Sequence, residues 1–129
     1  MRASGYVACA IVALAVLVAA GVSNAQTADG SIVVVRKNFP TPGREDELQT
    51  RWLKLVEFLR KAEPNAVFHL HRTTKAPVVF LWYEVFESQA ALENHLKVVI
   101  PAFQKEFGPT PEGILARPSE SETYRSISK

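Results

Sequence analysis

The chain of 129 residues suits one small domain, and its 15 Lys and Arg against 13 Asp and Glu give a formal charge of only +2. Without a basic cluster it lacks the electrostatic footprint of a nucleic-acid-binding protein, so no nucleic-acid partner is expected. Its one cysteine, Cys9, lies within the first 25 residues. If that stretch is removed, the remaining chain has no cysteine, which excludes disulfides, thiolate metal sites and cysteine nucleophiles.

Residues 1–25 have the three parts of a signal peptide. Arg2 supplies positive charge, residues 7–20 form an apolar run, and Ser23 and Ala25 place small side chains at a cleavage site. We therefore predict cleavage after Ala25, a periplasmic or secreted location, and a mature domain over residues 26–129 without stable membrane insertion. An uncleaved membrane anchor is the alternative, although the apolar run is short for a span.

A strand and a helix begin the mature domain. Residues 32–38 open with β-branched side chains, which favour a strand. After a turn at Pro42 and Gly43, apolar residues recur at the spacing of one buried helix face: Leu48, Trp52, Leu55 and Leu59. Pro64 ends this helix near Ala62, because the residue before a proline avoids the helical region.

Two further strands, residues 66–73 and 78–86, are expected to pair as a hairpin. The second is almost continuously apolar, so we expect a central strand that is covered on both faces. Glu84 is the only charged residue in it. Because side chains alternate along a strand, Glu84 shares a face with three aromatic residues: Phe80, Trp82 and Phe86.

A helix is expected directly after this strand. Ser88 can cap its first turn, and Ala91, Leu92 and Leu96 form an apolar stripe. His95 lies four residues after Ala91 and therefore on or beside that stripe. A separate short helix over residues 102–107 and a last strand over residues 122–127 complete the order β-α-β-β-α-β. This order predicts an α+β fold, the ferredoxin-like plait.

The run from the third strand into the following helix resembles the antibiotic biosynthesis monooxygenase family, which includes the small quinol monooxygenases. The shared pattern is a strand ending in Glu-x-Phe-Glu-Ser, followed by an Ala-Leu pair and a helical His. It stands here as Glu84, Phe86, Glu87, Ser88, Ala91, Leu92 and His95. The Pro-Gly turn and the order of elements over residues 31–127 also match. The resemblance implies a dimeric α+β barrel, in which the second sheet face packs on another subunit.

His95 and Glu84 are the candidate catalytic residues. The resemblance implies that His95 points into a pocket between sheet and helices, where it could hold a substrate hydroxyl or shuttle a proton. Glu84 could orient His95 or act as a base. The alternatives are a packing histidine bonded to Glu84 or to a backbone carbonyl, and a Glu84 paired with a backbone group, Arg36 or Arg72.

Four residues are candidates for binding a substrate. Trp52, Trp82 and Phe86 could stack on a flat aromatic ring, and Asn38 could donate to a substrate oxygen. The aromatic residues could equally be plain core, and Asn38 could be a turn former.

Metals and cofactors are not expected. His69 and His71 share a strand face, but no third ligand stands at a diagnostic spacing, so a wet edge or the dimer seam is the alternative to a metal site. No glycine-rich nucleotide fingerprint is present, so we expect neither flavin nor nicotinamide.

Together these features predict an exported, cofactor-independent monooxygenase-like protein that acts as a homodimer on a quinol or a similar aromatic small molecule. Two departures from the family leave open whether it is an enzyme. Family members often carry a second His where this chain has Ile100, and haem-degrading relatives use Trp where it has Phe86. The alternative is a non-catalytic dimeric module of the same fold that binds a small ligand.

Overall fold

A computed structural model describes residues 30–128 of the chain. The predicted signal peptide lies outside the described residues, so its cleavage stays a prediction. In chain order the elements are β1 (Ile32–Asn38), α1 (Glu45–Ala62), β2 (Val67–Arg72), β3 (Phe80–Phe86), α2 (Gln89–Asn94), the π-helical turn η1 (His95–Val99), α3 (Ile100–Phe107) and β4 (Glu120–Arg125). None of the described helices is both long and apolar enough to cross a membrane.

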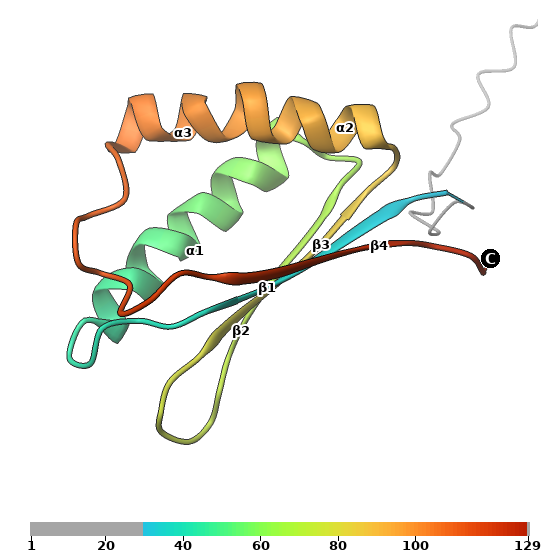
Figure 1. Cartoon of the computed structure of the whole chain (residues 1–129). Coiled ribbons are helices and arrows are strands. Elements are labelled where there is room, and N and C mark those ends of the chain that lie inside the picture. Colours follow the sequence, from blue (N-terminus) through green and yellow to red (C-terminus); the bar gives the residue numbers. More distant parts are fainter. Residues whose placement is uncertain (1–29, 129) are drawn as a thin grey trace, which may run out of the picture.

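The four strands form one antiparallel sheet in the order β2-β3-β1-β4. This order and the β-α-β-β-α-β sequence of elements confirm the predicted α+β, ferredoxin-like plait. All the helices lie on one face of the sheet (Figure 1). β3 is the central strand, between β2 and β1, so a residue on it is flanked on both sides. Glu84 on β3 lies opposite Val34 of β1 and Phe68 of β2.

The core lies between the sheet and the helices. Period-two alternation along β3 turns Phe80, Trp82, Glu84 and Phe86 towards the helices, and all four are buried. Trp52 of α1 meets the rings of Phe80 and Trp82 edge-on, with centroids 5.5 and 5.9 Å apart. The aromatic stripe of β3 and the first helix therefore meet in the core.

The helical segment after β3 is continuous, which corrects the expected separate short helix over residues 102–107. α2, η1 and α3 follow one another without a gap, and Ser88 caps the segment by accepting a hydrogen bond from the Ala91 N–H at 3.1 Å. Within η1 the Ile100 N–H donates to the His95 carbonyl, five residues back. Pro101 then falls at the start of α3, where its missing N–H and fixed φ are tolerated.

Leu96 is not part of the buried stripe, contrary to expectation. Its exposed fraction is 49%. The buried residues of the segment are Leu92, His95, Val99 and Phe103. Because His95 occupies the inner face, its neighbour Leu96 is rotated by about 100° towards solvent.

Within residues 30–128, no helix lies on the second face of the sheet. The side chains of β1 and β3 that point to this face are Val33, Val35, Leu81, Tyr83 and Val85. Of these residues only Val85 is buried. β4 covers residues 120–125 instead of the expected 122–127, and Tyr124 at its edge is exposed. An apolar but open sheet face is what the dimer hypothesis requires, and the second subunit itself stays a prediction.

Candidate functional site

His95 is held by Glu63, a residue that the sequence analysis did not select. The His95 Nδ1 lies 2.7 Å from the Glu63 Oε2. We assign Nδ1–H as the donor, because an ionised carboxylate only accepts. α1 brings Glu63 to this place: its N–H donates to the Leu59 carbonyl and closes the helix. The pairing therefore joins the end of α1 to the start of η1.

The imidazole of His95 is enclosed by aromatic rings. Phe68 stacks on it at a centroid distance of 5.6 Å, and Phe86 packs against it at 4.9 Å. The exposed fraction of His95 is only 1%. The structure thus places His95 on the inner face, as expected, but a ligand reaches it only through its neighbours.

Glu84 lies near the other ring nitrogen of His95, on the side opposite Glu63. Its Oε1 is 3.8 Å from the His95 Nε2, and its Oε2 is 3.9 Å from a guanidinium nitrogen of Arg36. Both distances exceed those of hydrogen bonds, and Oε2 has no hydrogen-bond partner among residues 30–128. The direct partner that orients the His95 ring is therefore Glu63, and Glu84 acts on it through space.

Burial sets the protonation of Glu84. With 3% of the residue exposed, the loss of solvation raises the pKa of the Glu84 carboxyl above its usual range. The positive charges of Arg36 and His95 oppose this rise, and the negative charge of Glu63 adds to it. Two acids, one histidine and the half-buried Arg36 thus form one group, which we call the Glu63–His95–Glu84–Arg36 array.

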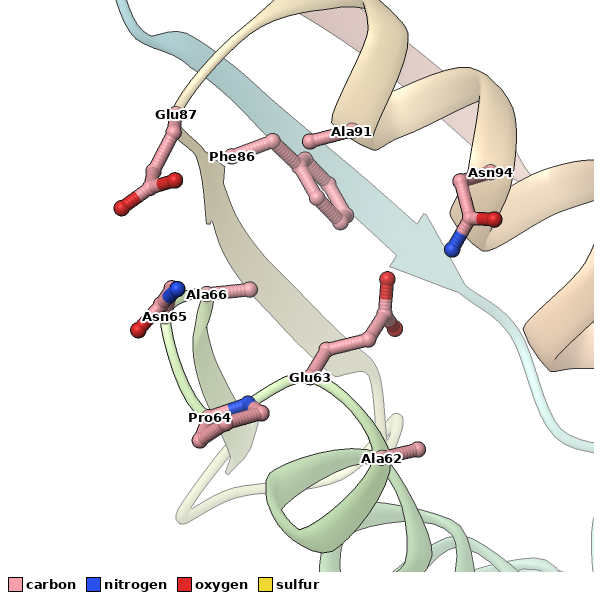
Figure 2. Close-up of a pocket in the computed structure, with 9 residues that line it drawn as sticks. All are labelled: Ala62, Glu63, Pro64, Asn65, Ala66, Phe86, Glu87, Ala91 and Asn94. Atoms are coloured by element: carbon pink, nitrogen blue, oxygen red, sulfur yellow. The ribbon is translucent and has the colours of Figure 1, made fainter.

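A pocket of about 220 Å³ opens beside this array (Figure 2). The end of α1, the turn before β2, the end of β3 and α2 contribute its lining: Ala62, Glu63, Pro64, Asn65, Ala66, Phe86, Glu87, Ala91 and Asn94. The Glu63 carboxylate points into the space between the Phe86 ring and Asn94, whereas Glu87 points away from it. Glu63 is the member of the array that lines the pocket, so it links the pocket to His95.

The predicted substrate-binding residues separate in the structure. Phe86 lines the pocket, whereas Trp52 and Trp82 pack against each other in the core. Asn38 is buried at the end of β1, where its amide donates to the Arg36 carbonyl at 3.3 Å and accepts from the Ser119 hydroxyl at 2.6 Å. The Asn38 amide thus ties β1 to the segment that enters β4.

Arg72 and the H-x-H pair lie elsewhere. Arg72 bonds Asp46 and Gln49 of α1 and does not reach Glu84. His69 and His71 stack on each other on the exposed face of β2. Within the described part of the chain, no group of three or more His, Cys, Asp or Glu side chains is placed to hold a metal ion.

One sequence signal could have indicated Glu63. It is an acid directly after the last turn of α1, where the helix dipole disfavours negative charge, and Pro64 fixes the chain beyond it. Such a position suggests a partner from elsewhere in the chain. The identity of that partner, His95, depends on tertiary contact across 32 residues.

The fold recurs in solved structures. A protein of Caulobacter crescentus CB15, described as an antibiotic biosynthesis monooxygenase, is 24% identical with a TM-score of 0.64, over 78% of this chain and 92% of its own. A protein of Shewanella oneidensis is 22% identical with a TM-score of 0.61, over 78% and 95%. One from Bordetella bronchiseptica, with the same description as the first, is 17% identical with a TM-score of 0.57, over 77% and 99%. At these identities the likeness shows the fold alone.

Sequence comparison supplies the family. No curated protein sequence matches the chain. The family model for antibiotic biosynthesis monooxygenases, in contrast, matches residues 31–105, more than half of the chain. This match spans β1 to α3 and includes Glu63, Glu84 and His95. The chain therefore belongs to the antibiotic biosynthesis monooxygenase family, and with it to the monooxygenase-like or small-ligand-binding modules.

Proposed function

We propose that this protein is an exported, cofactor-independent monooxygenase-like protein that acts on a quinol or a similar aromatic small molecule in the pocket beside Glu63. One observation carries the proposal: a carboxylate that lines the pocket is hydrogen-bonded to a buried histidine. Carboxylate and imidazole together can accept and pass on the proton of a phenolic hydroxyl.

The size of the pocket favours a small ligand. Pockets for drug-sized molecules measure about 300–1,000 Å³, whereas this one has about 220 Å³. A single aromatic ring with small substituents fits such a volume. Pro64 and Ala66 offer it apolar contacts, with the buried Phe86 ring behind them, and Asn65 and Asn94 offer amides.

An electron-rich ring can supply the chemistry itself. A quinol that transfers its hydroxyl proton to Glu63 becomes a better electron donor to dioxygen. In the overall reaction, quinol and dioxygen give a hydroxylated quinone and water: one oxygen atom enters the ring, the other leaves as water, and the quinol supplies all the electrons. The protein binds the ring, takes up its proton and excludes bulk water.

In this proposal Glu63 contacts the ligand, and His95 and Glu84 act on the ligand only through Glu63. The His95 ring is enclosed by Phe68 and Phe86, so His95 fixes Glu63 and shares its proton, and Glu84 adjusts the charge on His95. Both are positioning residues in this proposal, and Glu63 is the catalytic residue.

Oxygen consumption tests the activity. We expect uptake of dioxygen above the autoxidation rate when the protein is mixed with single-ring hydroquinones, with a hydroxylated quinone detected by mass spectrometry. Uptake that equals autoxidation across the panel, while the same hydroquinones bind, would contradict the catalytic proposal and leave the binding function.

A specific observation favours the second candidate, a non-catalytic module that binds a small ligand as a homodimer. His95 is closed off from solvent, and Ile100 stands where relatives often have a second histidine. In that case the pocket retains its ligand without turnover. Anaerobic binding of a hydroquinone, combined with the absence of oxygen uptake, distinguishes this module from the enzyme.

Export is a further part of the proposal, supported by the pattern of residues 1–25. We expect the exported protein to begin at Gln26. Intact-mass analysis measures this directly, and a secreted or periplasmic protein that retains the first 25 residues would contradict it.

A further inference from the structure

We propose that Glu63 is the group by which the pocket recognises its ligand, and that it selects an uncharged ring bearing a hydroxyl over a ring bearing a carboxylate. The inference rests on the proposed function of the pocket and specifies its ligand. It depends on three features: the free oxygen of Glu63, the charge of the lining, and the fixed position of the carboxylate.

Only one oxygen of Glu63 is engaged. Oε2 accepts from His95 at 2.7 Å, and within residues 30–128 the second oxygen, Oε1, accepts no hydrogen bond. The side chain is 10% exposed, and Figure 2 shows its carboxylate directed into the pocket. A carboxylate oxygen largely removed from water gains when a ligand donates to it. A phenolic hydroxyl is such a donor.

The charge of the lining opposes anions. Glu63 and Glu87 both contribute to the wall, and none of the residues that line the pocket is basic. A ligand carboxylate would lose solvation and meet the negative charge of Glu63 with no cation in the lining to compensate. A ring with a neutral hydroxyl keeps the apolar contacts with Pro64 and Ala66 and avoids this repulsion.

The position of Glu63 is fixed before a ligand arrives. Its backbone closes α1 through the Leu59 carbonyl, Pro64 restricts the chain after it, and His95 holds its carboxylate. His95 is itself locked between Phe68 and Phe86. A carboxylate held on both backbone and side chain loses little freedom on binding, so its bond to a ligand contributes to affinity and to orientation.

Two ligands of nearly the same shape separate the effect of the ligand's charge on binding from the effect of its size. We suggest calorimetric titration near pH 7 with 4-hydroxybenzamide and 4-hydroxybenzoate, which differ in charge but hardly in size, and anaerobic titration with hydroquinone. The variant is Glu63→Gln, which keeps the side-chain shape and removes the charge. The matched control is Glu93→Gln, which removes an exposed negative charge on α2 from a side chain that pairs with Lys97 and does not line the pocket.

The natural protein should bind the amide about tenfold or more tighter than the benzoate. In Glu63→Gln the Kd for hydroquinone should rise about ten- to a hundredfold, and the preference for the amide should shrink. Glu93→Gln should leave the Kd for hydroquinone within about twofold. Melting curves show whether the variants fold, and if Glu63→Gln does not, the comparison of amide with benzoate in the natural protein decides.

The possible failures are distinct. Equal affinity of the natural protein for the amide and the benzoate overturns the inference, as does a folded Glu63→Gln that binds hydroquinone like the natural protein. Either result leaves the pocket as a site for aromatic rings. If no ring compound binds to the natural protein at all, both the inference and the proposed function fail. Binding without oxygen uptake leaves the inference standing and removes only the enzymatic proposal.

Discussion

At the residue scale, the notable feature is an acid kept inside the protein without a hydrogen bond on one oxygen. Glu84 Oε2 is buried, and its nearest cation, the Arg36 guanidinium, is 3.9 Å away. Burial without full compensation disfavours the charged form. Keeping such a group buried lowers the stability of the folded chain. Buried ionisable groups with a shifted pKa are common at functional sites.

Glu84→Gln should reveal this cost through its pH dependence. Because burial raises the pKa of Glu84, the folded protein keeps this proton over a pH range in which the unfolded chain has lost it. The free energy of unfolding therefore falls as pH rises from the ordinary carboxyl pKa of about 4.3 through the raised folded value. The variant lacks this contribution, so its stability relative to the natural protein should increase with pH. Urea unfolding at several pH values measures the difference, and a relative stability that decreases with pH would contradict the pKa direction.

His95 offers the second residue-scale prediction. His95→Ala removes the partner of Glu63 and leaves a void between Phe68 and Phe86, so the free energy of unfolding should fall by about 2–4 kcal/mol. Ligand binding should also weaken, by about 1–3 kcal/mol after correction for the folded fraction. His95→Gln should restore part of the binding if hydrogen bonding alone matters. Unchanged affinity in a less stable His95→Ala protein would show that His95 is only a packing residue.

The sequence could predict three members of the array, with Arg36 as one of two possible arginine partners of Glu84, but not the fourth, Glu63. Glu84 and His95 stand in a local pattern, a strand followed by a capped helix, and period-two and helical spacing turn both inward. Glu63 has no such pattern, because it lies outside the periodic part of α1 and meets His95 only when the helices pack on the sheet. Local spacing also cannot reveal that Phe68 and Phe86 close over the imidazole.

At the element scale, the helical segment after β3 shows why boundaries were harder to predict than element types. The sequence predicts all the strands and α1 in the correct order, but it predicts a separate helix over residues 102–107 where the structure has α3 continuing from η1 at Ile100. A proline is incompatible with the interior of a regular helix and compatible with the start of one. The π-helical turn η1 creates such a start within a continuous segment, and the sequence carries no simple signal for it.

Pro101→Ala tests this interpretation, because the two positions predict opposite signs for the change in the free energy of unfolding. In a regular helix interior, replacing proline should stabilise by about 3 kcal/mol. At the start of α3 the ring is compatible with the backbone and restricts the unfolded chain, so the replacement should lower the free energy of unfolding by about 0.4–1 kcal/mol. Thermal and urea unfolding measure the change, with Pro109→Ala in the loop after α3 as the control. A gain of several kcal/mol would contradict the assignment of Pro101 to a helix start.

At the scale of the whole molecule, the helices of the described part of the chain cover one face of the sheet and leave the other face open. Val33, Val35, Leu81 and Tyr83 are half-buried in the single chain, beside the exposed Tyr124. Contiguous apolar surface of this kind marks an interaction site. The continuous apolar character of β3 predicted a strand covered on both faces, and a second copy of the chain would supply the missing layer.

We therefore expect a homodimer through the open sheet face. Light scattering at micromolar concentration should give twice the monomer mass for the natural protein. Val35→Glu, on the sheet face, should give a monomer, because it places charge in the centre of the contact. The control Leu53→Glu, an exposed position on α1, should remain a dimer. A natural protein that is monomeric throughout would contradict the dimer hypothesis.

The central claim is that a ligand in the pocket acts on His95 through Glu63, and the nitrogen resonances of the histidine side chains test it most directly. The described chain provides internal controls, since His69 and His71 lie on the exposed face of β2, away from the array. Anaerobic titration with hydroquinone should shift the His95 Nδ1 resonance, identified by its loss in His95→Gln, and should leave the other two nearly unchanged. A His95 resonance that does not move at saturating ligand would contradict the claim.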